Sequence, residues 1–146
     1  MPAARRPFPW RWALAGLLLP SSLVLAWEAW TARGLARLAE DWRRAHDARD
    51  VAAMEALYLW DGVPEDLRRR VRLVLLQELD LPVAGARAAP LSAADLQYGP
   101  RSRPNGDPVG VVEVRFASSD GLGARLLAGR DGLDFRLLLV VPVAGP

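Results

Sequence analysis

The pattern of hydrophobic and polar positions divides the chain near residue 30. Residues 12–27 (WALAGLLLPSSLVLAW) carry no charged side chain, and Glu28 ends this run. A helix that spans the hydrocarbon core of a membrane takes about 20 apolar residues, so the run is slightly short for a span. From residue 31 onward, apolar positions recur first at helical and then at strand spacing. We therefore expect a distinct segment, 1–30, followed by one small folded domain, 31–146.

The first helix of the domain is predicted over residues 31–48. Leu35, Leu38 and Trp42 fall at i, i+3 and i+7, which places them on one face of a helix. Charged residues occupy the opposite side. This helix is therefore expected to be amphipathic, with one side in a core, and to be able to continue from the segment that precedes it.

Two further helices are predicted before residue 80. A short one over 51–60 follows an aspartate that suits the N-cap position, and it is expected to end at Asp61-Gly62. The next begins at Val63-Pro64, where proline and two acids favour a helix N-terminus. It runs to about Leu79 and has an apolar face of leucines and valines.

In the last part of the chain, apolar and polar residues alternate, which is the spacing of β-strands. Strands are predicted at 109–117, 122–128 and 134–143. An Asp-Gly pair stands in each of the two gaps, which is a signal for a hairpin turn. The run 137–141 is apolar at every position, so the third strand should be covered on both faces or lie within a sheet.

The combined pattern predicts an α+β fold. Residues 80–108 hold five prolines, so we expect an irregular connection that can include a short strand near 82–88. The helices over about 31–79 would pack on one face of a small antiparallel meander of three to four strands over 109–143. An N-terminal transmembrane or signal helix would precede this domain.

The charge of the chain belongs to its N-terminus. All 19 basic residues are arginines, and the abundance of arginine with no lysine is typical of a GC-rich bacterial genome. Arg5, Arg6 and Arg11 precede the uncharged run, whereas residues from 28 onward have 16 arginines against 17 acids, a formal charge of −1 (16 − 17). The domain therefore lacks the basic surface that nucleic-acid binding needs, and no nucleic-acid partner is expected.

The N-terminal segment has two interpretations. In the first it is an uncleaved anchor that crosses the bilayer through residues 12–27, with interfacial tryptophans on both sides: Trp10, Trp12, Trp27 and Trp30. The arginines would then keep the N-terminus in the cytoplasm, and the domain would lie outside the inner (cytoplasmic) membrane in a single-pass arrangement. In the second it is a signal peptide that is cleaved after Ala26, which releases an exported domain.

Few residues are candidates for chemistry. The chain has no cysteine and one histidine, so neither a metal site nor a cofactor is expected. His46, Tyr58 and Asp61 are the candidates for proton transfer in a pocket between helices and sheet. Each also has a structural interpretation: His46 as a polar residue at a helix end, Tyr58 as part of an apolar helix face, and Asp61 as part of a helix stop.

Residues 45–58 (AHDARDVAAMEALY) resemble the opening helices of the SnoaL-like, nuclear-transport-factor-like cone fold. Members often begin with two helices that are joined by an A-R-D turn and close on A-L-Y, and they end in an antiparallel sheet. The resemblance implies that Tyr58 lies in the core or lines a pocket; some members use an acid or a histidine deep in the cone, and many are not enzymes. The chain departs from the family pattern where 62–64 start a helix in place of a strand, and its sheet is one or two strands short.

Two functions follow as hypotheses. The leading one is a membrane-tethered bacterial envelope protein, whose extracytoplasmic domain is a non-catalytic binding or assembly module with a protein partner in the envelope. The alternative is a small enzyme that uses Asp61, Tyr58 or His46 for proton transfer. The enzyme requires a pocket that brings at least two of these side chains to one point, whereas an exposed apolar patch would favour binding.

Overall fold

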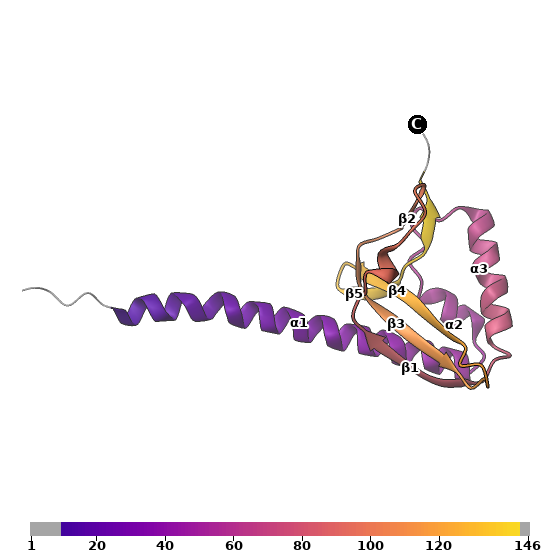
Figure 1. Cartoon of the computed structure of the whole chain (residues 1–146), viewed down its shortest axis with the longest axis horizontal. Helices are drawn as coiled ribbons and strands as arrows, with labels where there is room; N and C mark the ends of the chain where they lie inside the picture. The colour runs from indigo at the N-terminus through magenta and orange to yellow at the C-terminus, as the bar shows by residue number, and fades with distance from the viewer. Residues whose placement is uncertain (1–9, 144–146) are drawn as a thin grey trace, which may run out of the picture. The chain divides into compact units, whose positions relative to one another are not determined.

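The computed structural model describes residues 10–143, with side chains from residue 23 onward, and contains two compact units, Met1–Thr31 and Ala32–Pro146 (Figure 1). Helix α1 covers Trp10–Asp47, and its residues 32–47 belong to the second unit. Across the described residues, we find no helix with the length and apolar character required to span a bilayer. The side chains of residues 12–22, on which the membrane interpretation largely depends, lie outside this description.

The second unit has the predicted α+β composition. Helix α1 is followed by α2 (Val51–Ala56) and α3 (Glu65–Glu78). The turn between α1 and α2 contains Arg49 in the left-handed region, at φ 54°, and the N-cap Asp50 accepts a hydrogen bond from the backbone N–H of Ala53 at 2.9 Å. The prediction of a helix over 51–60 is corrected at its end, because α2 stops at Ala56, before Asp61-Gly62.

The chain leaves α2 to join the sheet. Tyr58 forms a one-residue parallel bridge with Leu137, through the N–H of Leu137 to Leu57 O at 2.8 Å and the N–H of Leu59 to Leu137 O at 2.9 Å. These backbone bonds outweigh the helical preference of the segment.

Four strands form the main antiparallel sheet, in the order β1-β3-β4-β5. Their bounds are Val83–Ala89, Pro108–Phe116, Gly123–Asp131 and Asp134–Leu137. A second, two-stranded antiparallel sheet pairs β2 (Ser102–Pro104) with β6 (Val140–Pro142). The Asp-Gly pairs lie in the β3–β4 and β4–β5 turns, where Gly121 and Gly132 have φ of 67° and 62°.

Two sequence expectations are corrected by the sheets. Within residues 80–108, β1 confirms the short strand expected near 82–88, whereas the 3₁₀ turn η1 (Ala94–Leu96) and β2 were not expected. The single strand expected over 134–143 is split, because the chain passes from β5 in one sheet to β6 in the other. The uniformly apolar run supplies both faces, since Leu137 joins the core on the helix side and Leu138 joins the core on the opposite side.

The larger core lies between the three helices and one face of the main sheet. Its fully buried members include Trp42 and Met54 from the helices and Val112 and Val114 from β3. The predicted stripe of α1 is therefore the stripe that packs on the sheet. The helices cover one face of the sheet, as predicted.

Arg125 binds Asp95 of the 3₁₀ turn η1, which lies in the segment that covers the other face of the sheet. Its Nε and Nη2 each donate to a carboxylate oxygen of Asp95 at 2.8 Å, and its Nη1 donates to Glu113 at 3.1 Å. The bidentate bond from Arg125 holds the pKa of Asp95 well below its ordinary value. Asp95 belongs to η1, so this network ties η1 to the strands over a small core formed by Val111, Leu127 and Leu138.

Helix α1 approaches the sheet closely at Gly34. A Cβ atom at this position would lie 2.1 Å from the ring of Phe135 in β5. We predict that Gly34→Ala lowers the free energy of unfolding by about 1–2 kcal/mol, because the overlap outweighs the roughly 1 kcal/mol that alanine contributes inside a helix. Chemical denaturation of the purified full chain measures this change. Gly85→Ala is the control, since a Cβ there meets no atom within 4 Å. A Gly34→Ala variant as stable as the parent would contradict the prediction.

Candidate functional site

The structure separates the three residues proposed for proton transfer. His46 and Tyr58 are 5% and 8% exposed and lie in the packed interior on the helix side of the sheet. Asp61 is exposed in the turn that follows the bridge between Tyr58 and Leu137. It lines an open hollow formed with residues 103–108 and β6, and neither His46 nor Tyr58 contributes to the wall of that hollow. The three side chains therefore do not surround one accessible point.

His46 is more than a polar residue at a helix end. Its ring stacks on the fully buried Trp42, with ring centroids 5.2 Å apart and planes inclined by 22°. The Nε2 atom lies 3.0 Å from the backbone carbonyl oxygen of Glu78, the last residue of α3. That carbonyl also accepts a hydrogen bond from the N–H of Leu81 at 2.9 Å, so His46 adds a contact from α1 to a carbonyl at the end of α3 that already has a backbone partner.

Glu78 is the residue that sequence reasoning missed. Its side chain points into the helix-side interior, where Oε2 is buried without a hydrogen-bond partner. Burial raises the pKa of the Glu78 carboxyl, and a positive charge on His46 opposes this rise. A signal was present in the sequence, because Val71, Leu75 and Glu78 follow i, i+4, i+7 spacing and so place a carboxylate on the apolar face of α3.

Tyr58 completes this group, which we call the buried polar cluster: Trp42, His46, Tyr58 and Glu78. Burial, together with the negative charge of Glu78, raises the pKa of the Tyr58 phenol well above its ordinary value. The phenol therefore stays protonated through the physiological range. Trp42, His46 and Tyr58 are buried, whereas Glu78 is partly exposed.

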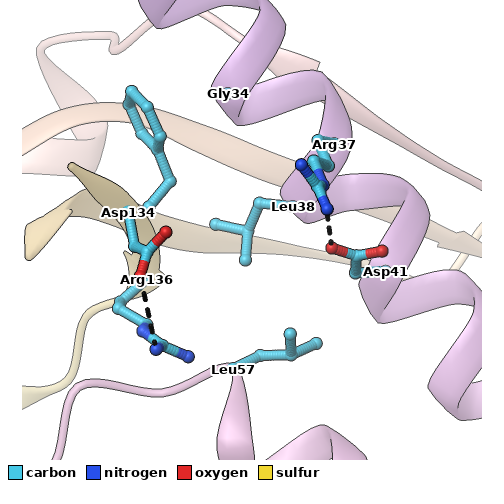
Figure 2. Close-up of a pocket in the computed structure, with 8 residues that line it drawn as sticks. Gly34, Arg37, Leu38, Asp41, Leu57, Asp134 and Arg136 are labelled. Carbon is cyan, nitrogen blue, oxygen red and sulfur yellow. Dashed lines mark ion pairs between the residues drawn. The ribbon is translucent and has the colours of Figure 1, made fainter.

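An open hollow lies between α1 and β5 (Figure 2). We call it the α1–β5 hollow; it has a volume of about 230 Å³, and Leu38 and Leu57 line it together with charged residues. An acid and a base stand on each of two walls. Its charged residues are Arg37 and Asp41 from α1, and Asp134 and Arg136 from β5.

The ion pairs on the two walls of the α1–β5 hollow are long, although Asp41 also accepts a hydrogen bond from Arg44 Nη1 at 3.1 Å. Arg37 Nε lies 3.9 Å from Asp41, and Arg136 Nη2 lies 3.9 Å from Asp134, both longer than a hydrogen bond. Arg136 is fixed by a 2.6 Å bond from Nη1 to the carbonyl of Ala56 at the end of α2. The hollow thus presents charged groups of both signs beside leucine side chains.

The proposed membrane-interface residues are described only in part. Trp27 and Trp30 lie on α1 with ring centroids 5.2 Å apart. Arg5 and Arg6 lie outside the described residues, as do the side chains of Trp10, Arg11 and Trp12. Neither the anchor nor the signal interpretation is therefore tested by the packing of these side chains.

Within the described part of the chain, no group of three or more histidine, cysteine or acidic side chains is arranged to hold a metal ion. Comparisons with known proteins do not assign the chain to a family. No protein-family model matches the chain, and no curated protein is similar to it in sequence.

Asn105 joins three segments next to Asp61. Its Nδ2 donates to Leu59 O at 2.6 Å and to Asp61 O at 3.2 Å, and its Oδ1 accepts from the N–H of Leu139 at 2.9 Å. We predict that Asn105→Ala costs about 2–3 kcal/mol of stability, because these backbone groups lose their partner. Chemical denaturation measures the loss, and hydrogen exchange should increase in residues 57–61 and 138–141. The exposed Gln97→Ala serves as control, and an equal effect of both variants would contradict the role of Asn105.

Proposed function

We propose that this protein is a membrane-tethered bacterial envelope protein, and that its domain is a non-catalytic module for binding or assembly. The domain would lie outside the inner membrane and be held there by residues 12–27. This topology is supported by the arginines before the run and the tryptophan pairs around it. It is also supported by the helical backbone of α1, which includes the run, since a spanning segment must satisfy its own backbone hydrogen bonds.

The observation that carries the binding role is the contrast between a filled interior and an open, charged surface. Large side chains occupy the space between helices and sheet, where an enzyme of the cone fold would hold its substrate; Trp42, Met54 and Leu75 are at most 1% exposed. The α1–β5 hollow instead presents acids and bases beside Leu38 and Leu57. We propose that it receives a partner segment with an apolar side chain flanked by charged ones.

The outer side of α3 supports the same role. Leu73, Val74 and Leu76 are exposed on this helix, so the domain does not bury all of its apolar side chains. Exposed apolar side chains that cluster on one element favour contact with a partner. The alternative of a small enzyme that uses Asp61, Tyr58 or His46 has less support, because these residues do not share an accessible point.

Topology is tested by labelling, which is simple because the chain has no cysteine. Ser119→Cys places a thiol in the exposed β3–β4 turn, and Ala3→Cys places one before the uncharged run. A membrane-impermeant maleimide applied to cells with a permeabilised outer membrane should label Cys at position 119 and leave position 3 unlabelled until the inner membrane is broken. Labelling of position 119 only after lysis would contradict the proposed orientation.

Retention of the anchor is tested by the mass of the protein recovered from membranes. We expect a mass that includes residues 12–27 and resistance to extraction by alkaline carbonate. Leu18→Arg should release the domain from the membrane, because a charge near the middle of a spanning helix costs about 3 kcal/mol. A mature chain that begins at Trp27 and is free of the membrane would establish the signal-peptide interpretation instead.

The binding role is tested by photo-crosslinking from the full chain in intact cells. A photoreactive residue at Arg37 or Asp134, on opposite walls of the hollow, should form the same adducts. The same residue at Asp120, in the turn at the far end of β4, is the matched control. Adducts that are equally frequent from position 120, or absent from both walls, would contradict binding at the hollow.

A further inference from the structure

One side of helix α3 is not covered by the rest of the domain. Val71, Leu75 and Leu79 turn the other side into the core between helices and sheet. Away from that core, the side chains of Leu73 and Leu76 are 60% and 46% exposed. Figure 1 shows α3 as an outer layer of the second unit. Two large apolar side chains thus lie next to each other on the solvent side of one helix.

The uncovered side of α3 has the spacing of a seam between two helices. Arg69, Leu73 and Leu76 follow one another at intervals of four and three residues, and side chains at these intervals form the contact line of a helix pair. We call these three residues the α3 seam. Arg70 and Arg72 stand at the positions that border such a seam, where charged side chains select the partner helix.

The α3 seam is positively charged in a domain that is not. Residues 65–77 have four arginines against two acids, a formal charge of +2 (4 − 2), whereas residues from 28 onward carry −1 (16 − 17). Arg70 pairs with Asp66 at 2.6 Å, and Arg72 pairs with Glu55 at 3.2 Å. Among the described residues, the guanidinium of Arg69 has neither an ion pair nor a hydrogen bond. Its charge is therefore available to a group from outside the domain.

A small open hollow adjoins the seam and gives such a group room. Its volume is about 170 Å³, and Arg69 lines it together with Trp60 and Arg68. The guanidinium of Arg68 lies 5.0 Å from the centre of the Trp60 ring. Two carboxylates, of Glu55 and Glu65, also line the hollow and disfavour a small free anion. A carboxylate that is held in place by a larger apolar contact is the better occupant.

We propose that the α3 seam binds an acidic amphipathic helix of another envelope protein. Apolar side chains of that helix cover Leu73 and Leu76, and one of its carboxylates pairs with Arg69. A second copy of α3 would instead bring one surface of charge +2 against another. A lipid surface requires a continuous apolar face, whereas Arg69 stands in line with the leucines. The inference rests on the proposed binding role and names the class of partner for α3.

Peptide binding to the purified full chain in detergent micelles tests the charge preference. The probes are two synthetic peptides of about three heptads, with leucine at a and d and either glutamate or lysine at e and g. We expect the glutamate peptide to bind about tenfold more tightly than the lysine peptide, because only its carboxylates complement the arginines. Fluorescence anisotropy of the labelled peptides measures both affinities. Equal affinities, or no binding of the glutamate peptide, would overturn the proposal.

Substitutions in the full chain locate the binding surface. Arg69→Glu should weaken binding of the glutamate peptide about tenfold and should not weaken binding of the lysine peptide, whereas Leu73→Ser should weaken both. Arg101→Glu and Leu133→Ser are the matched controls, because these side chains are exposed in other parts of the domain. Chemical denaturation checks that each variant is folded. Equal losses in the variants and their controls would contradict binding at the α3 seam.

Two further measurements identify a different occupant. Leu73→Cys introduces the only thiol of the chain, so a disulfide-linked dimer of this variant in membranes would show that α3 pairs with itself. Displacement of the glutamate peptide by phosphatidylglycerol added to the micelles would point to an anionic lipid surface. Either result would overturn the acidic partner. Crosslinks from positions 37 and 134 would still support binding at the α1–β5 hollow, so this inference can fail while the proposed function stands.

Discussion

The close approach of α1 to the sheet is the constraint on which the domain depends. Gly34 leaves room for the ring of Phe135, and Gly110 in β3 leaves room for Leu35, since a Cβ there would lie 2.4 Å from Leu35 Cδ1. Two glycines on facing elements thus allow the stripe of α1 to reach the sheet, where Trp42 becomes fully buried. The same approach draws His46, one turn beyond Trp42, into the interior and brings it against the end of α3.

This packing also decides where a partner can bind. Trp42, Met54 and Leu75 occupy the interior between the helices and the sheet and are at most 1% exposed. The accessible features lie at the margin, where α1 meets the edge strand β5 and where α3 exposes apolar side chains. A partner at these places would make contacts spread over a surface, which is characteristic of protein association.

The local patterns in the sequence predicted most of the elements, and long-range contacts account for what they missed. The stripe of Leu35, Leu38 and Trp42 and the alternation in β3 follow from periods that each element shows by itself. β1 (VAGARAA) is the short strand expected near 82–88, but its small side chains gave no sign that it pairs with β3. The break between β5 and β6 is likewise set by Asn105, which is 34 residues away from Leu139 and binds its backbone.

The candidate site was harder to predict from the sequence than the fold, because it also depends on long-range contacts. The sequence singled out His46 and Tyr58 as titratable groups but gave them no shared environment, because their common neighbour Glu78 belongs to another helix. The cluster and the α1–β5 hollow both depend on α1, with Trp42 stacked on His46 and Leu38 one turn earlier lining the hollow. Both features therefore depend on where α1 is placed against the sheet and against α3, which the pattern of any single element does not show.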